Sequence, residues 1–298
     1  MNDPVLLFAT QNQIPIQTEE PLSRHTTFQI GGPARYFALP QTVKQLCLLL
    51  DYAFAARLNY AVIGNGSNLL AEDCGFDGLV IRTPEEAPVW LSEEEVSVSA
   101  GYLLSRLAAA AADRGLSGLT FAQGIPGTVG GGIVMNAGAY GGQISDVLFS
   151  SECWTPEGIK QISFSEHRLS YRHSIYTEHP DWVVLRGVFR LKKGDPAQIA
   201  FEMADYAARR REKQPLEWPS AGSTFQRPAG NFAGKLIEDC GLKGFTIGGA
   251  QVSEKHAGFL INRNHATSED MHRLMARVTE IVEEKTGVHL VPEVKDLK

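Results

Sequence analysis

The feature that most restricts the fold of this chain is a concentration of glycine in one short segment. Residues 123–142 read QGIPGTVGGGIVMNAGAYGG and contain eight glycines. Because glycine costs about 0.5 to 1 kcal/mol relative to alanine inside a helix or strand, we expect no packed element here. The backbone is expected to face something large and flat or highly charged, and a diphosphate-linked cofactor fits that description. A glycine-rich packing loop is the alternative.

A second, smaller glycine cluster follows a predicted strand directly and consists of Gly64, Asn65, Gly66, Ser67 and Asn68. Backbone amides in such a turn can point inward and hold a phosphate, and glycine is needed where φ is positive or where a Cβ would come too close. An ordinary connection between strands explains the same residues equally well. The cluster is not a dinucleotide-binding fingerprint, because the pattern GxGxxG is missing.

Composition restricts the class of protein further. The chain has 298 residues, which is about twice an ordinary domain, so two domains or one large one are expected. Hydrophobic residues make up 43% of the chain, enough to build packed cores. The net charge of −6, from 28 Lys and Arg against 34 Asp and Glu, offers no general attraction to nucleic acid or to an anionic membrane.

Neither a metal site nor a membrane segment is expected. The four cysteines form no CxxC pair and the eight histidines form no HExxH pair, so the spacings typical of zinc sites are missing. No apolar run approaches the roughly 18 to 20 residues of a transmembrane helix. The N-terminus also lacks the basic region and the apolar length of a secretory signal. We therefore expect a cytoplasmic protein with reduced cysteines.

Hydrophobic periodicity predicts helices and strands throughout the chain, so the expected fold is α+β or α/β with two unequal parts. Helices are predicted at residues 41–57, 103–114, 196–211, 231–239 and 267–287. Strands are predicted at residues 60–63, 79–81, 96–100, 146–154, 182–191, 221–226, 246–253, 258–262 and 288–294. Thr267 and Asp270 have the capping-box spacing at the start of the last helix, and Gly287 ends it. A domain boundary is expected near Gly194.

An arginine in a polar connection marks one candidate site. Arg172 lies in the sequence SYRHS, where its planar guanidinium can bind a carboxylate through two parallel hydrogen bonds. A solvated surface arginine is the alternative. Further on, residues 209–213 form a basic run at the end of a predicted helix. That run either complements the helix dipole or binds a phosphate.

Ser223 and Glu293 are candidates of a different kind. Ser223 lies in AGSTFQRP, with the cationic Arg227 four residues later, and it lacks the surrounding pattern of a serine nucleophile. It is therefore a candidate proton donor. Glu293 lies in the predicted terminal strand, where an acid is either exposed, which is the default, or buried for a purpose.

Taken together, these segments resemble the UDP-N-acetylmuramate dehydrogenase family, also called UDP-N-acetylenolpyruvoylglucosamine reductase. The resemblance spans nearly the whole chain. It rests on HTTFQIGGPARYF, IGNGSNLL, GIPGTVGGGIVMNAGAYGG, YRHS, GSTFQRP, AGKLIEDCGLKG, VSEKHAGFLIN and the closing PEV. Each motif is weak alone, whereas their order and combination are specific. The short interval from Arg172 to Arg210 resembles the subgroup that lacks an extra substrate-covering loop.

The resemblance implies an α+β fold, with an FAD-binding half of the vanillyl-alcohol-oxidase type and a C-terminal α+β substrate domain. The FAD-binding half consists of two α+β subdomains. The expected bounds are 1–85, 86–194 and 195–298, and the C-terminal strand is free to return to the FAD-binding half. FAD would be held without a covalent bond, through backbone amides. The implied cofactor-binding residues are Gly64, Asn65, Gly66, Ser67, Asn68, Gly124, Ile125, Gly127, Thr128 and Gly130.

The resemblance also implies a reaction in two halves. NADPH first reduces the flavin, and the enolpyruvyl ether of UDP-N-acetylglucosamine then accepts the hydride and becomes UDP-N-acetylmuramate, a peptidoglycan precursor. Arg172 and Glu293 match the residues that stabilise charge near the substrate carboxylate, and Ser223 matches the general acid. The implied substrate-binding residues are Tyr171, Arg210, Lys213 and Arg227. A monomer without a metal ion is expected.

The chain departs from the family pattern in three places. His25 replaces a common asparagine, Gln226 and Arg227 replace a frequent Lys-Asn pair, and the final residues DLK lack the usual closing glycine. The first two departures lie near ligand-binding segments and concern the fine contacts to flavin and substrate phosphate, whereas the reaction type is unchanged because Arg172, Ser223 and Glu293 all persist. Two other interpretations stay open. One is an oxidase of the same flavin fold, and the other is a catalytically silent flavin or nucleotide-sugar sensor.

Overall fold

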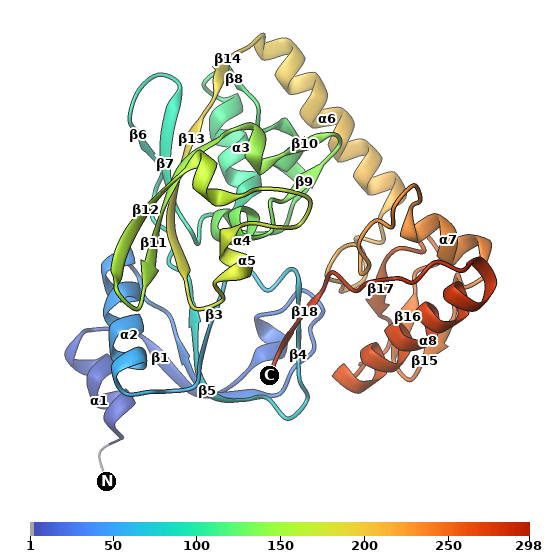
Figure 1. Cartoon of the computed structure of the whole chain (residues 1–298), viewed down its shortest axis with the longest axis horizontal. Helices are drawn as coiled ribbons and strands as arrows, with labels where there is room; N and C mark the ends of the chain where they lie inside the picture. The colour runs from blue at the N-terminus through green and yellow to red at the C-terminus, as the bar shows by residue number, and fades with distance from the viewer. Residues whose placement is uncertain (1–2) are drawn as a thin grey trace. The chain divides into compact units, whose positions relative to one another are not determined.

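The structure, a computed structural model, describes residues 3–298. This part of the chain divides into two compact units. Unit 1 contains the residues up to Gln17, Tyr36–Asn65 and Gly78–Arg209, and unit 2 contains Thr18–Arg35, Gly66–Asp77 and Arg210–Lys298. The expected mixture of helices and strands is confirmed in both units (Figure 1).

Unit 1 is built on a five-stranded sheet with the order β12-β11-β13-β7-β6, and its neighbouring strands are antiparallel. The strands are β6 (Val89–Trp90), β7 (Glu95–Ser99), β11 (Leu148–Thr155), β12 (Gly158–Ser163) and β13 (Val183–Arg190). The predicted strands at 96–100, 146–154 and 182–191 are therefore confirmed. Helices α3 (Leu104–Ala112) and α4 (Val129–Val134) share one hydrophobic core with this sheet.

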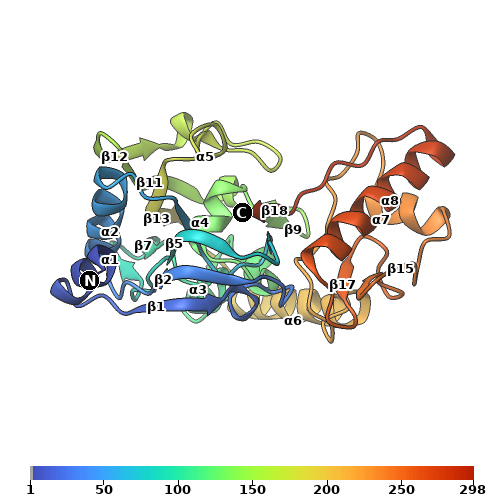
Figure 2. The same cartoon turned by 90° about the horizontal axis from the view of Figure 1, so that it is seen from below.

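A second sheet has the order β1-β2-β5-β3, and its strands β3 and β5 are parallel. Its strands are β1 (Ile16–Pro21), β2 (Pro33–Ala38), β3 (Tyr60–Ile63) and β5 (Phe76–Arg82). Helices α1 (Pro4–Gln11) and α2 (Val43–Ala55) lie side by side (Figures 1 and 2), with the Phe8 and Tyr52 rings stacked 4.1 Å apart. Thr42 caps α2 by accepting a hydrogen bond from the Gln45 amide, as N-cap residues do.

Unit 2 has its own core, formed between a small antiparallel sheet and two helices. The sheet contains β15 (Thr246–Ile247), β16 (Ala250–Val252) and β17 (Leu260–Asn262), and the helices are α7 (Ala233–Asp239) and α8 (Ser268–Thr286). A separate parallel pair joins β4 (Leu69–Ala71) to the C-terminal β18 (Lys295–Leu297). The predicted helices at 231–239 and 267–287 are confirmed.

The remaining elements are short, apart from one long helix that contains the border between the units. This helix is α6 (Pro196–Lys213), which begins two residues after Gly194, where the domain boundary was expected. It carries Arg210, Arg211 and Lys213 in its last turn. The other elements are β8 (Leu116–Ser117), β9 (Gly138–Ala139), β10 (Gly142–Gln143), α5 (Ile175–Glu178), β14 (Lys192–Lys193) and the 3-10 turns η1 (Leu22–Arg24), η2 (Thr120–Gly124), η3 (Ile144–Asp146) and η4 (Phe164–His167).

Two predicted strands are wrong as regular elements. The segments 221–226 and 288–294 contain no strand, and the bridge between Phe225 and Pro292 is the pairing that joins them. The terminal strand begins only at Lys295. Alternating apolar residues signalled an extended backbone correctly, but a ladder also requires a continuous partner, which no local pattern encodes.

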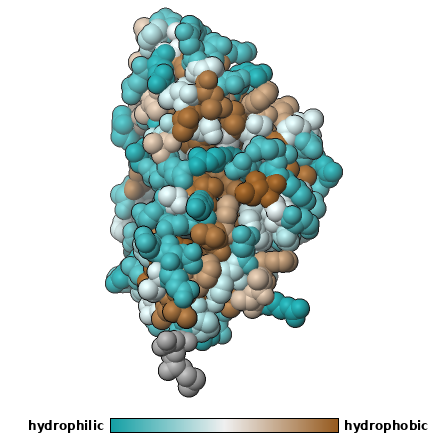
Figure 3. Space-filling view, turned by 90° about the vertical axis from the view of Figure 1, so that its left-hand side faces the viewer, coloured by the Kyte–Doolittle hydropathy of each residue, from teal (hydrophilic) through white to brown (hydrophobic). Residues whose placement is uncertain are grey.

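The surface of the described residues is mixed. Figure 3 shows hydrophobic patches interrupted by hydrophilic side chains on one face of the molecule. Exposed large apolar residues such as Ile159 and Phe201 are common on protein surfaces. No helix among residues 3–298 combines the length and the apolar character needed to cross a membrane. The four cysteines are free thiols.

Candidate active site

The glycine-rich segment 123–142 is partly a packed element. It forms α4, where the Gly130 amide donates to the Ala100 carbonyl at 2.8 Å. A Cβ on Gly130 would lie 2.8 Å from the Ala100 Cβ, and one on Gly132 would lie 2.8 Å from a Leu104 methyl group. The expectation that glycine excludes packing here is therefore wrong over Val129–Val134. These glycines allow α4 to approach its neighbours more closely than a side chain permits.

The two glycine clusters meet in unit 1 beside the start of α4. A Cβ on Gly64 would lie 2.3 Å from Thr128 Oγ1, and the Asn65 side-chain amide donates to the Pro126 carbonyl at 2.7 Å. Thr128 caps α4 by accepting from the Gly131 amide. The first cluster therefore serves as more than a connection between strands, because its backbone is pressed against the second cluster.

This junction fits a diphosphate-linked cofactor in its chemistry. The side-chain oxygen Oε1 of Gln123, at the start of the glycine-rich segment, is buried and has no hydrogen-bond partner within residues 3–298. A buried acceptor without a donor is costly and points to a missing N–H or O–H group, which the flavin ring and the ribityl and ribose hydroxyls of FAD offer and its diphosphate does not. The closely packed backbone at Gly64 leaves peptide groups rather than side chains available for an anion. The structure does not test the individual FAD contacts at Gly124, Ile125, Gly127 or Gly130.

The rest of the first cluster belongs to unit 2. Gly66 has φ +61°, and a Cβ there would lie 2.1 Å from the His25 carbonyl oxygen, so local packing alone requires this glycine. Asn68 joins the terminal segment, because its side-chain amide donates to the Glu293 carbonyl at 3.2 Å and its own carbonyl accepts from the Lys295 amide at 2.9 Å. Ser67 is half-buried beside them.

Arg172 lies on a tight turn in unit 1. Ser170 and His173 exchange backbone hydrogen bonds of 3.2 Å, and Arg172 between them has φ +54°, in the left-handed region. Its guanidinium carbon lies 5.0 Å from the centre of the exposed Tyr171 ring. We call residues 170–173 the Arg172 turn. A non-glycine residue in this conformation is uncommon and is often associated with function.

The Arg172 turn is tied to the glycine-rich segment by two side chains. The Asn136 side-chain amide donates to the Ser170 carbonyl at 3.0 Å, and the Ser174 hydroxyl donates to the Val134 carbonyl at 2.7 Å. The buried Asn136 also accepts from the Ser145 amide through Oδ1 at 2.9 Å. The structure thus brings together two features that the sequence marked separately. The supporting roles of Asn136 and Ser174 were missed, although both lie within or beside motifs.

Ser223 and Glu293 are brought together in unit 2. The Glu293 amide donates to the Thr224 carbonyl at 2.8 Å, so Ser223 and Glu293 lie on neighbouring extended segments. The Ser223 side chain is exposed, whereas Glu293 is half-buried rather than fully exposed as the default predicted. Thr224, which sequence reasoning missed, is fully buried, and its hydroxyl accepts from the Leu260 amide at 3.1 Å.

The three remaining cationic candidates also belong to unit 2. Arg210 and Lys213 lie in the last turn of α6, and Arg227 lies over the Phe232 ring, with its guanidinium carbon 4.7 Å from the ring centre. The candidate catalytic and substrate-binding residues therefore form two groups that the structure describes separately. Tyr171 and Arg172 are in unit 1, and the others are in unit 2. The convergence of Arg172 with Ser223 and Glu293 stays a prediction.

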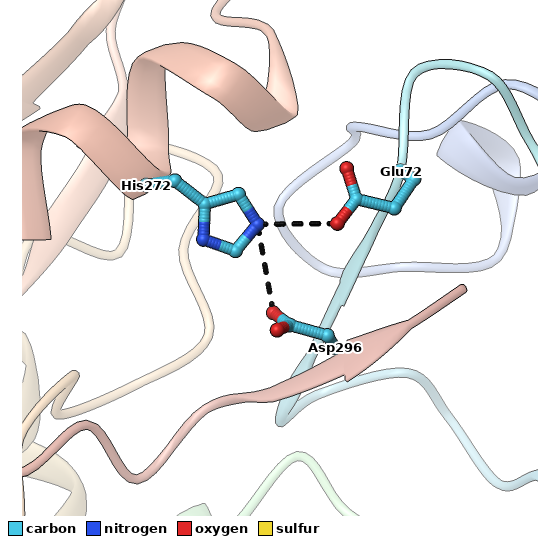
Figure 4. Close-up of side chains that lie close together, drawn as sticks. All are labelled: Glu72, His272 and Asp296. Atoms are coloured by element: carbon cyan, nitrogen blue, oxygen red, sulfur yellow. Dashed lines mark hydrogen bonds and ion pairs between the residues drawn. The ribbon is translucent and has the colours of Figure 1, made fainter.

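One cluster in unit 2 has the residue types of a metal site. His272 Nε2 lies 3.3 Å from a Glu72 carboxylate oxygen and 3.6 Å from one of Asp296 (Figure 4). The other Glu72 oxygen accepts from the Ser268 hydroxyl at 2.9 Å. A hydrogen-bonded network that joins α8 to β4 and β18 explains these side chains without an ion. The expectation of no metal site stays a prediction.

Two family models match different parts of the chain. A model described as "FAD binding domain" matches residues 34–162, and one described as "UDP-N-acetylenolpyruvoylglucosamine reductase, C-terminal domain" matches residues 214–297. The first matched stretch includes the junction of the two glycine clusters. The second includes Ser223, Glu293 and most of the unit 2 core.

Several whole proteins are similar along nearly their full length. The chain is 47% identical to the UDP-N-acetylenolpyruvoylglucosamine reductase of Agathobacter rectalis, with 95% of this chain and 94% of that protein covered. It is 46% identical to that of Caldanaerobacter subterraneus, with 93% and 91% covered. The crystal structure of the enzyme from Thermus caldophilus matches with a TM-score of 0.80 at 32% identity, covering 96% of this chain and 99% of that one.

Proposed function

Because the chain belongs to the UDP-N-acetylenolpyruvoylglucosamine reductase family, we propose how its residues divide the work of that family's reaction. The protein is a flavin-dependent oxidoreductase of peptidoglycan precursor synthesis that uses FAD and NADPH. The fold is the α+β fold of that family, with an FAD-binding domain and the reductase C-terminal domain. The assignments of individual residues are proposals.

The junction of the two glycine clusters holds the FAD diphosphate in this proposal. Gly64 and Asn65 from one side and Thr128 from the other form its backbone-lined wall, and the buried Gln123 oxygen accepts from an N–H or O–H group elsewhere in the cofactor, because the diphosphate offers no donor. The observation that carries the proposal is the packing of Gly64 directly on Thr128. Bound FAD supplies the hydride that NADPH has delivered. The other proposed contacts are Gly66, Ser67, Asn68, Gly124, Ile125, Gly127 and Gly130.

Arg172 binds the carboxylate of the enolpyruvyl group. Its planar guanidinium offers two parallel hydrogen bonds to a carboxylate, and the charge stabilises the negative charge that develops next to that group during hydride transfer. Glu293 shares this part of the site. The two side chains that tie its turn to the glycine-rich segment support the assignment, because a solvated surface arginine needs no such attachment.

Ser223 delivers the proton that completes the reduction. A positioned acid contributes roughly a hundredfold to ten-thousandfold to such a step. Ser223 has an exposed hydroxyl on a segment that is fixed by the backbone hydrogen bond between Thr224 and Glu293. Tyr171, Arg210, Lys213 and Arg227 bind the rest of the substrate, and the cationic members of this group suit its diphosphate.

Three domains, 1–85, 86–194 and 195–298, are proposed on the basis of three hydrophobic cores. One core draws mainly on residues before 82, one on residues 96–191, and one mainly on residues after 220. The short chain between Arg172 and α6 supports membership of the subgroup without the substrate-covering loop. The free cysteines fit a reducing cytoplasm. A monomer is proposed as well.

The function is tested by the colour of the flavin. Purified protein should be yellow, anaerobic NADPH should bleach it, and UDP-N-acetylglucosamine-enolpyruvate should restore the colour. Reoxidation by oxygen but not by this substrate would indicate an oxidase. A flavin that NADPH does not reduce would indicate a sensor.

A further inference from the structure

A buried group of three side chains lies at both ends of the loop that carries the Arg172 turn. Ser151 is on β11, His167 is at the end of η4, and Tyr176 is in α5. The exposed fractions of these residues are 0%, 0% and 3%. None of them has a place in the reaction proposed above, and buried polar side chains in a sheet interior need a reason.

The Ser151 hydroxyl joins the other two side chains. Its Oγ lies 2.7 Å from His167 Nε2 and 2.6 Å from the Tyr176 hydroxyl. With one hydrogen and two lone pairs, this hydroxyl can serve both partners at once, whichever ring nitrogen carries the His167 proton. Burial lowers the pKa of His167, so the ring stays neutral, and burial raises the pKa of Tyr176, so its phenol stays protonated. The group therefore persists at neutral pH.

The loop between these two ends is under conformational strain. Arg168 and Arg172 both have positive φ, at +52° and +54°. Such conformations persist only where the surroundings determine them. Asn136 and Ser174 hold the middle of the loop against the glycine-rich segment. The buried Ser151 hydroxyl joins its two ends, which an exposed ion pair between Arg168 and Glu178 at 2.7 Å also spans.

We propose that Ser151, His167 and Tyr176 form a clamp that keeps the Arg172 turn in its left-handed conformation and so positions Arg172 for the substrate carboxylate. This inference rests on the proposed role of Arg172 and deepens it. Ser151 is a positioning residue, because it is fully buried and acts through the loop. The clamp serves the half-reaction with the enolpyruvyl substrate and has no part in flavin reduction by NADPH.

The first test is Ser151→Ala, with the two half-reactions measured separately by stopped flow. Reoxidation by UDP-N-acetylglucosamine-enolpyruvate should slow roughly tenfold, since a small misplacement of a catalytic group is enough for such a loss. Flavin content and the rate of reduction by NADPH should stay within about twofold of wild type. Trypsin should cut after Arg168 or Arg172 faster than in wild type, because the loop opens more often.

Thr155→Ala is the matched control. Thr155 is also buried on β11, and its hydroxyl donates to the Gly158 carbonyl at 2.8 Å, away from the Arg172 turn. The control should lose stability without a change in the ratio of the two half-reactions. An equal slowing of reoxidation in the control would overturn the clamp, because general loosening of the sheet would then explain both variants.

Tyr176→Phe breaks one arm of the clamp, keeps the buried ring, and should slow reoxidation by a smaller factor than Ser151→Ala. It also tests the clamp if Ser151→Ala does not fold. Unchanged tryptic cleavage and unchanged reoxidation in Tyr176→Phe would overturn the clamp. A different outcome is that tryptic cleavage accelerates in the clamp variants while Arg172→Lys leaves reoxidation unchanged. The proposed role of Arg172 would then be wrong, and the clamp would hold the loop without serving the reaction.

Discussion

Side-chain hydrogen bonds attach the Arg172 turn to the glycine-rich segment, whereas a backbone hydrogen bond joins the segments of Ser223 and Glu293 to each other. The side chains are those of Asn136 and Ser174. The backbone bond is the one that the Glu293 amide donates to the Thr224 carbonyl. A side-chain tie is lost in a single substitution, whereas a backbone bond survives most of them. Arg172 is thus expected to be more easily displaced than the Ser223–Glu293 pair.

The comparison predicts that a substitution at Ser223 changes the proton-transfer step and leaves the local backbone structure unchanged. Ser223→Ala removes the proposed acid and leaves the backbone bond at Thr224 intact, so reoxidation by the enolpyruvyl substrate should slow roughly a hundredfold to ten-thousandfold. Reduction by NADPH should stay near normal. Stopped-flow measurement of both half-reactions checks this.

Ser220→Ala is the control for that variant, because Ser220 lies on the same segment and pairs with Ile261 through the backbone. It should behave like wild type. Equal losses in the two half-reactions of Ser223→Ala would remove Ser223 from the role of acid.

Arg172→Lys should have the next largest effect. Lysine keeps the charge and loses the two parallel hydrogen bonds, so reoxidation should slow about tenfold to a hundredfold while flavin content is unchanged. Arg168→Lys is the control on the same loop, since Arg168 is exposed and pairs with Glu178. A colourless Arg172→Lys protein with normal turnover after FAD is added would assign Arg172 to the cofactor instead.

The third prediction concerns the wall that the glycine clusters form. A Cβ at Gly64 would press on Thr128, and overpacking costs about 1 to 3 kcal/mol. Gly64→Ala should therefore weaken FAD binding by about tenfold, measured by flavin fluorescence on dilution. Gly194→Ala is the control, because a Cβ there would lie 3.0 Å from the Ser117 Cβ, which belongs to neither glycine cluster. It should lower the melting temperature and leave FAD affinity intact, and equal losses would contradict a specific cofactor wall.

Local chemistry explains which parts of the fold could be predicted from the sequence. Helix α8 begins and ends where its motif says, because the Thr267 hydroxyl accepts from the Asp270 amide at 3.0 Å and Gly287 has φ +72°. These contacts lie within a few residues of one another. The strands predicted at 221–226 and 288–294 failed because the backbone partners change along each segment, so no continuous ladder forms.

The site follows the same rule. Motifs identified Arg172, Ser223 and Glu293, and the structure tests only where their segments lie within each unit. The side chains that hold them are polar residues with ordinary local surroundings, such as Ser151 and Asn136. Although Asn136 lies within a motif, the sequence does not show that its partner is the Ser170 carbonyl, 34 residues later. Glycine was ambiguous for a related reason, since close packing against Ala100 and close approach to a ligand require the same absence of a side chain.

The smallest expected effect is a pH dependence of stability that comes from two buried histidines, one in each unit. Burial lowers the pKa of His167 near the Arg172 turn and of His256 near Thr224 and Gly258, so both rings are neutral in the folded state. The unfolded chain binds protons below its ordinary histidine pKa of about 6.5. The free energy of unfolding should therefore fall as pH drops below about 6.5, by at most about 1.4 kcal/mol per pH unit for each histidine.

Urea unfolding between pH 7 and pH 5.5 measures this slope. His256→Asn keeps an acceptor for the Gly258 amide, which donates to His256 Nδ1 at 3.1 Å, and it removes one titrating ring. The variant should retain the part of the slope that belongs to His167. Because His167 is a member of the clamp, the Arg172 turn should still open more often at low pH in this variant, measured as tryptic cleavage relative to that of an unstructured peptide at the same pH. If the dependence of the unfolding free energy on pH disappears completely in His256→Asn, His167 does not resist protonation. Low pH would then leave the side-chain hydrogen bonds of the Arg172 turn intact.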